Sequence, residues 1–135
     1  MKHALIVALI FLIVLLVFLF APRGAAAEGR EAFIDHCAGC HGADAGGDGP
    51  MAGILSVAPA DLTGLSRANG GVFPLGQVLR RVDGREEVRA HGGAMPVFGR
   101  LLDGPSVAVL APDGSEIVTS EALAGIAVWL EEIQR

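Results

Sequence analysis

The chain has 135 residues, which is enough for one domain of ordinary size. Its formal net charge is −5, from 15 acidic and 10 basic side chains, and this balance excludes nucleic acid as a natural partner. Hydrophobic residues make up 52% of the chain, but an uncharged apolar run over residues 4–21 raises this average.

The N-terminal segment has the layout of an export signal. A basic start precedes the apolar run of residues 4–21, and the alanines at 25–27 follow it as an A-x-A-like cleavage site. We therefore expect a signal peptide over residues 1–27 and a mature domain over residues 28–135, located in the periplasm or a similar extracytoplasmic compartment. The run is also long enough to cross a bilayer, so a retained N-terminal membrane anchor through residues 4–21 is the alternative.

Residues 28–37 show the apolar spacing of a short helix, and this helix leads into the sequence Cys37-Ala38-Gly39-Cys40-His41. C-x-x-C-H is the attachment signature of a c-type haem, because the cysteines hold the porphyrin while the histidine reaches the iron. A disulfide or a thioredoxin-like redox pair would explain the cysteines but not His41. A zinc site would need two further ligands, and no second ligand pair is present. We expect one covalent haem c.

The next segments predict a loop and a helix. Five glycines and a proline within residues 42–53 indicate a loop, and the absence of a nearby lysine excludes a phosphate-binding P-loop. Residues 75–82 lie between Pro74 and an Asp-Gly pair, and their apolar spacing predicts a helix of about two turns.

The C-terminal part predicts a hairpin followed by a helix. Two short apolar runs, at 107–111 and 116–119, flank a Pro-Asp-Gly-Ser turn signal, and a plain loop is the alternative. Thr119 or Ser120 is expected to cap the final helix. Its inward stripe consists of Leu123, Ile126, Ala127 and Leu130.

The iron's second axial ligand decides between an electron carrier and an open-site haem protein. Met95 is the leading candidate, because the glycines and proline of residues 91–99 suit a loop laid against a flat cofactor. Met51 lies too close to His41 in sequence to reach the opposite face easily. His91 is the rival ligand, and a gap-filling core role is the alternative for Met95.

These features resemble the small monohaem cytochrome c family over nearly all of residues 28–135. Besides the haem motif and the M-P-V-F-G sequence at Met95, Gly29 and Phe33 match the family's first helix, and I-A-V-W-L at 126–130 is similar to its last helix. The resemblance implies an all-α fold whose helices wrap around one haem, with the hairpin as an addition. It also implies that the two helices cross, that Gly29 allows their close approach and that Phe33 meets Trp129.

The resemblance further implies a proline whose carbonyl accepts a hydrogen bond from the histidine ligand. Pro59 looks like that residue, and Pro50 is the runner-up. The implied function is electron transfer between redox protein partners, without enzymatic activity. A haem subunit of an oxidoreductase complex is the alternative, followed by an open-site haem enzyme or gas sensor. The mature part contains no lysine, which argues against a partner of the mitochondrial type.

Overall fold

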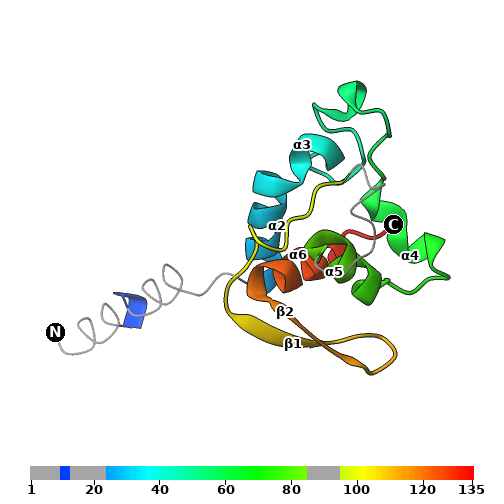
Figure 1. Ribbon diagram of the computed structural model, residues 1–135. Helices are drawn as coiled ribbons and strands as arrows, with labels where there is room; N and C mark the ends of the chain where they lie inside the picture. The colour runs from blue at the N-terminus through cyan, green and yellow to red at the C-terminus, as the bar shows by residue number, and fades with distance from the viewer. Residues whose placement is uncertain (1–9, 13–23, 85–94) are drawn as a thin grey trace.

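The computed structural model describes residues 10–12, 24–84 and 95–135, and Figure 1 shows their arrangement. Helices enclose an apolar core, and a two-stranded sheet packs beside them. The predicted mostly helical fold with a small hairpin is therefore confirmed, whereas its wrapping around haem stays a prediction. The helices, the 3-10 turns (η) and the strands follow one another as α2 (Ala25–His36), α3 (Ala38–His41), η1 (Ala52–Ile54), η2 (Leu62–Gly64), α4 (Leu65–Ala68), α5 (Leu75–Asp83), β1 (Ser106–Leu110), β2 (Glu116–Ser120) and α6 (Glu121–Glu132).

The first and last helices, α2 and α6, form the main helix pair (Figure 1). They approach so closely at Gly29 that a Cβ atom on this residue would collide with the backbone carbonyl of Gly125. Farther along the contact, the rings of Phe33 and Trp129 pack with their centroids 4.6 Å apart and their planes tilted by 48°. The close approach at Gly29 and the Phe33–Trp129 contact are both confirmed.

Helix α2 begins earlier than predicted, at Ala25 rather than at residue 28. Alanine is the strongest helix former, so the three alanines extend the helix without a side-chain cap at Gly24. The predicted cleavage position after residue 27 thus falls in the first turn of α2. Most of the predicted leader lies outside the described residues. Among the residues that are described, no helix is long and apolar enough to cross a membrane.

The predicted hairpin is present as the antiparallel pair of β1 and β2, with Ala108 opposite Val118. Val109 and Ile117 pack on the core, whereas Leu110 and Val118 lie on the outer face with 71% and 69% of their surface exposed. The alternation follows from the two-residue period of a strand.

Ser120 is the N-cap residue of α6. The sequence had allowed either Thr119 or Ser120 in this role. The Ser120 hydroxyl donates to the carbonyl oxygen of Leu102 at 2.5 Å and accepts from the amide of Leu123 at 3.3 Å. The predicted inward stripe of α6 is buried throughout. These contacts attach the hairpin to the helical core.

The C-terminus holds the segment around η2 and α4. Gln134 Nε2 donates to the Leu62 carbonyl oxygen at 2.8 Å, and the Ser66 amide donates to Gln134 Oε1 at 2.8 Å. The Arg135 amide also donates to the Thr63 carbonyl oxygen at 2.9 Å. This segment follows directly after the residues that face His41, so the C-terminal tail supports that part of the site.

Candidate haem site

The C-x-x-C-H sequence lies where α2 ends and α3 begins. Cys37 is the C-cap residue of α2, and its amide donates to the Phe33 carbonyl oxygen at 2.8 Å. The single turn of α3 then brings Cys40 and His41 three and four residues beyond Cys37, which places all three side chains on one side of the turn. Both cysteines are free thiols, so the alternative of a disulfide is not realised in the structure.

Burial distinguishes the two thiols. Cys37 is a member of the apolar core with 6% of its surface exposed, whereas Cys40 is half-buried. Burial, with a smaller contribution from Cys40, raises the pKa of the Cys37 thiol to about 11. A thioredoxin-like pair needs a lowered thiol pKa, so the structure argues against that alternative.

His41 is held by one backbone contact. Its side chain is 9% exposed, and Nδ1 lies 2.9 Å from the carbonyl oxygen of Ala60. A carbonyl can only accept, so Nδ1 carries the hydrogen and Nε2 keeps the lone pair that a metal requires. The arrangement fixes both the tautomer and the ring orientation, as is usual for a histidine ligand.

The acceptor differs from the sequence prediction, which named Pro59 with Pro50 as runner-up. In the structure Ala60, one residue after Pro59, supplies the oxygen. The Pro59 carbonyl oxygen faces Gly47 instead and lies 2.6 Å from where a Cβ atom on Gly47 would be. Alternate carbonyls of an extended segment point in opposite directions, so a shift of one residue exchanges the two roles.

The glycine-rich loop after His41 folds back onto the haem motif itself. Three loop amides donate to carbonyl oxygens of the motif. The Gly47 amide bonds to His41 at 2.8 Å, the Gly49 amide to Cys40 at 3.0 Å and the Met51 amide to Gly39 at 2.9 Å. A Cβ atom on Gly49 would lie 2.6 Å from the Cys40 carbonyl carbon and oxygen, so only glycine permits this contact. The loop thereby satisfies the carbonyls at the end of α3, which have no partner in the helix.

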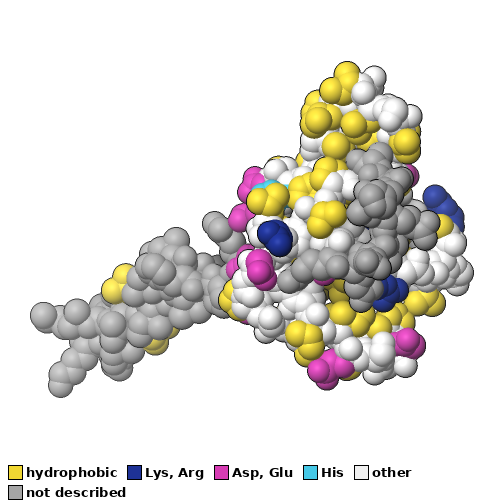
Figure 2. All heavy atoms as spheres, in the orientation of Figure 1, with side chains coloured by type: hydrophobic (Ala, Val, Ile, Leu, Met, Phe, Trp, Pro, Cys, Tyr) yellow, Lys and Arg dark blue, Asp and Glu magenta, His cyan; other side chains and the backbone are white. Residues whose placement is uncertain are grey.

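The outer surface of this loop is apolar. Figure 2 shows hydrophobic side chains gathered over the lobe that contains η1. Its most exposed large side chains are Met51, Ile54 and Val57. Met51 is 45% exposed, and its sulfur lies 3.6 Å from the position of a Cβ atom on Gly39. Met51 therefore lies beside the motif, and its rejection as the second axial ligand stays a prediction.

Met95 is half-buried and packs against the same apolar core that contains Cys37. In the chain it is followed by Phe98, whose ring centroid lies 6.4 Å from that of His36, the last residue of α2. The Met95 loop therefore reaches the end of α2 at which the motif begins. His91, the rival ligand, lies outside the described residues.

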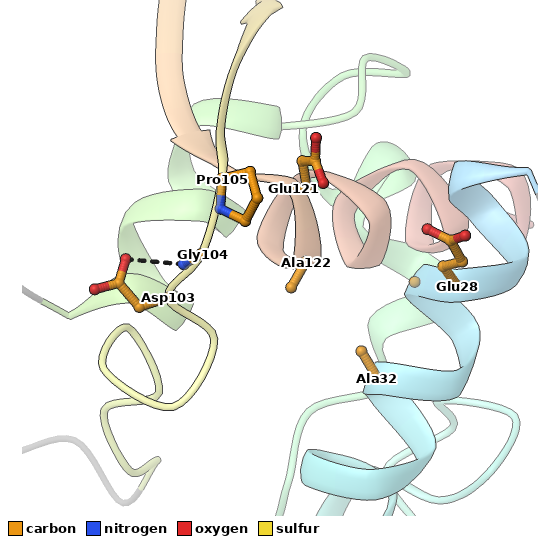
Figure 3. A pocket seen from close by; sticks show the side chains of 8 residues that line it. Glu28, Ala32, Asp103, Gly104, Pro105, Glu121 and Ala122 are labelled. Atoms are coloured by element: carbon orange, nitrogen blue, oxygen red, sulfur yellow. Dashed lines mark hydrogen bonds between the residues drawn. The ribbon is translucent and has the colours of Figure 1, made fainter.

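A separate hollow of about 250 Å³ lies between the first turns of α2 and α6 and the chain at Gly104 (Figure 3). Three acidic residues, Glu28, Asp103 and Glu121, line it together with small residues, and the Asp103 carboxylate accepts a hydrogen bond from the Gly104 amide at 3.1 Å (Figure 3). Ala32 is the lining residue of α2 nearest to the motif and precedes Cys37 by five positions, about 8 Å along a helix; no lining residue belongs to the haem motif, so the hollow is distinct from it.

The described residues fit a covalent haem. Two unpaired thiols and an oriented imidazole share one helical turn, and an apolar core with a half-buried methionine adjoins them. None of the buried side-chain nitrogen or oxygen atoms in the described part of the chain lacks a hydrogen-bond partner. The donor set is therefore that of a haem with thioether attachments and a nitrogen ligand.

The sequence model of the cytochrome c family matches residues 26–108, and the chain belongs to this family. The match includes the haem motif, Ala60 and Met95, and it ends in β1, so β2 and α6 lie beyond it. Comparisons with curated proteins and with solved structures gave no significant match.

Family membership establishes the cofactor and the general role. The protein binds haem c covalently, uses the iron for electron transfer and exchanges electrons with redox partners. Members of the family are typically electron carriers rather than enzymes, and their domains are commonly extracytoplasmic.

Proposed function

We propose that this protein is an extracytoplasmic monohaem electron carrier whose iron is ligated by His41 and Met95. The hydrogen bond between His41 Nδ1 and the Ala60 carbonyl oxygen, at 2.9 Å, carries the assignment of the first ligand. The half-buried position of Met95 on the core that contains Cys37 supports the second. Pro59 supports the site indirectly, because its peptide precedes the one that orients the imidazole.

The bound haem supplies a reversible one-electron change at its iron. The chain's part is to hold the surroundings constant during that change. Cys37 and Cys40 would hold the ring at the junction of α2 and α3, and the hydrogen bond to the Ala60 carbonyl oxygen fixes the orientation of the His41 imidazole. An apolar core that excludes water and two fixed neutral ligands keep the reorganisation small and favour the reduced form.

The sequence supports export of the protein and an electron partner with a basic surface. The leader over residues 1–27 would deliver the domain to the periplasm or leave it attached to the outer side of a membrane. Its removal would take the net charge from −5 to −7, because two of the 10 basic side chains lie within it. An acidic carrier is best matched by a respiratory or dehydrogenase partner with a basic docking face.

A permanent subunit of one oxidoreductase is the second candidate, and the hairpin is the observation that favours it. Its outer face presents Leu110 and Val118 to solvent, and within the described part of the chain β1 and β2 pair with each other alone. Copurification of a stoichiometric partner from the native host, lost on Val118→Ser, would support this candidate. A chain that is recovered alone and monomeric supports the diffusing carrier.

Carbon monoxide binding separates a closed from an open iron site. We expect the ferrous protein to bind it slowly at neutral pH, and Met95→Ala to bind it rapidly with a lowered reduction potential. Met51→Ala is the matched control, because it removes the same side chain from an exposed position. Rapid binding by the unmodified protein would instead indicate an open-site haem enzyme or gas sensor.

A further inference from the structure

The chain after Met95 returns to the end of α5 and pairs with it. The Phe98 amide donates to the Val82 carbonyl oxygen at 3.1 Å, and the Gly99 amide donates to the Asp83 carbonyl oxygen at 3.2 Å. Both carbonyls lie in the last turn of α5, where helix carbonyls have no partner within the helix. The pairing therefore completes the end of α5 and fixes the position of the returning chain.

Two glycines make this pairing sterically possible. Gly84 caps α5 in the left-handed conformation with φ at +61°, and a Cβ atom on it would lie 2.7 Å from both Val97 methyl carbons. Gly99 is buried, and a Cβ atom on it would collide with the backbone and carboxylate oxygens of Asp83. Rotation of the exposed Val97 side chain relieves only part of its clash, because the Val97 Cβ atom itself lies 3.1 Å from the same position, whereas the Asp83 backbone cannot move at all without disturbing α5. Position 99 is therefore the stricter of the two.

The pairing joins the Met95 loop to α5, and the same loop contacts α2, the helix that leads into the haem motif. Val82 and Leu102, on either side of the junction, are buried in the core. The Phe98 ring approaches His36 at the end of α2, as described above. Met95 lies only three residues before Phe98, a span of at most about 11 Å of chain. Fixing residues 98 and 99 thus restricts where the Met95 sulfur can reach.

We propose that Gly99 is a positioning residue, which holds the Met95 sulfur at the iron by allowing the backbone pairing with Val82 and Asp83. This inference rests on the proposed function, in which Met95 is the second axial ligand. A ligand carried by a loop is held at its metal only as firmly as the loop itself is held. The paired amides supply that restraint from the main chain, so no side chain of conspicuous chemistry marks it in the sequence.

The test compares Gly99→Ala with Gly104→Ala in the haem-loaded, full-length protein. We expect Gly99→Ala to lower the ratio of Met-ligated to unligated iron by about tenfold, equivalent to about 1.4 kcal/mol. This ratio is measured from the far-red band of ferric iron with a thioether ligand and from the rate of carbon monoxide binding to the ferrous form. Gly104→Ala should change neither, because no atom lies within 4 Å of its Cβ position and its φ is not in the left-handed region.

A second pair of variants covers the case in which Gly99→Ala does not fold. Gly84→Ala should weaken ligation by displacing Val97, and adding Val97→Ala should restore part of it, because the two methyl contacts at 2.7 Å are then removed. The backbone strain at position 84 is the same in both variants, so a difference between them reports the contact with Val97. Equal ligation in the two variants would overturn the proposal.

Met95→Ala distinguishes failure of this inference from failure of the proposed function. Loss of the far-red band in Met95→Ala, together with its full retention in Gly99→Ala, would overturn the positioning role and leave the ligand assignment intact. Retention of the band in Met95→Ala would overturn both. We expect the far-red band to be lost in Met95→Ala, strongly weakened in Gly99→Ala and unchanged in the Gly104→Ala control.

Discussion

Gly29→Ala should destabilise the protein, although the same change stabilises most helices. A Cβ atom on Gly29 would overlap the Gly125 carbonyl and lie 2.5 Å from the Ile126 backbone nitrogen, so even the mildest of these contacts is about 1 Å closer than a comfortable one. Backbone atoms cannot rotate away, so α2 and α6 would have to separate. A gap of this size forfeits a quarter to a half of the dispersion energy of the atoms it parts, including those of Phe33 and Trp129.

The expected net loss is about 2 kcal/mol in the free energy of unfolding. Overpacking of this kind costs up to about 3 kcal/mol, and the higher helix propensity of alanine returns about 1 kcal/mol. The loss is a substantial part of the 5–15 kcal/mol typical of a domain and should lower the melting temperature by about 8 °C.

The assay is urea and thermal unfolding of the haem-loaded protein, followed by far-ultraviolet circular dichroism. Gly76→Ala in α5 is the control, because its Cβ position meets only the Arg80 guanidinium at 3.2 Å and the Ile117 methyl at 3.4 Å, and both are side-chain ends. We expect Gly76→Ala to be neutral or to stabilise by up to about 1 kcal/mol. A neutral or stabilising Gly29→Ala would refute the close helix crossing.

Three further outcomes are expected. Ser120→Ala should cost about 2–3 kcal/mol in urea unfolding, because it removes the cap of α6 and leaves a buried carbonyl without its donor. The Thr63 hydroxyl and amide hold the pKa of Asp61 below its ordinary value of 3.8, so this carboxylate stabilises the fold above pH 3.8 and the contribution is lost as the pH falls through the lowered pKa. Asp61→Asn should accordingly be less stable than the unmodified protein at about pH 6, and this difference in stability should shrink as the pH falls below 3.8 towards about pH 2. In protein produced without haem, iodoacetamide should alkylate Cys40 well before Cys37, whose pKa is raised to about 11 by burial.

Each of these expectations has a contradicting result. Ser115→Ala removes an exposed hydroxyl bond to Asp113 and should cost less than about 0.5 kcal/mol, so an equal loss at positions 115 and 120 would contradict the capping role. The Asp61–Thr63 contact would be contradicted if Asp61→Asn and the unmodified protein differed in stability by the same amount at both pH values. Equal alkylation of both thiols, read by peptide mass spectrometry, would show that Cys37 is not buried.

Much of the fold could be predicted because its signals are local. The stripe of α6 follows the helical period, and the hairpin is marked by two apolar runs around a turn sequence. The haem motif is contiguous, so its chemistry can be recognised without tertiary structure. The contact between Phe33 and Trp129 had a different basis, since it was implied by the family resemblance rather than by spacing.

The features that could not be predicted are those that main-chain geometry alone determines. Any residue has a carbonyl oxygen, so the choice between Pro59 and Ala60 depended on the local chain direction, which the residue types do not record. The pairing of residues 82–83 with 98–99 is likewise made of main-chain groups, and only the glycines at 84 and 99 hint at it. The early start of α2 was missed because residues 25–27 suit both a cleavage site and a helix.

The most direct test of the account observes the methyl groups of the methionines by NMR in the reduced, haem-loaded protein. A thioether methyl bound to iron lies over the porphyrin ring, and the ring current should shift its signal far upfield of the others. We expect one such signal, absent in Met95→Ala and retained in Met51→Ala. No shifted methyl signal, or one that disappears with Met51, would contradict ligation of the iron by His41 and Met95.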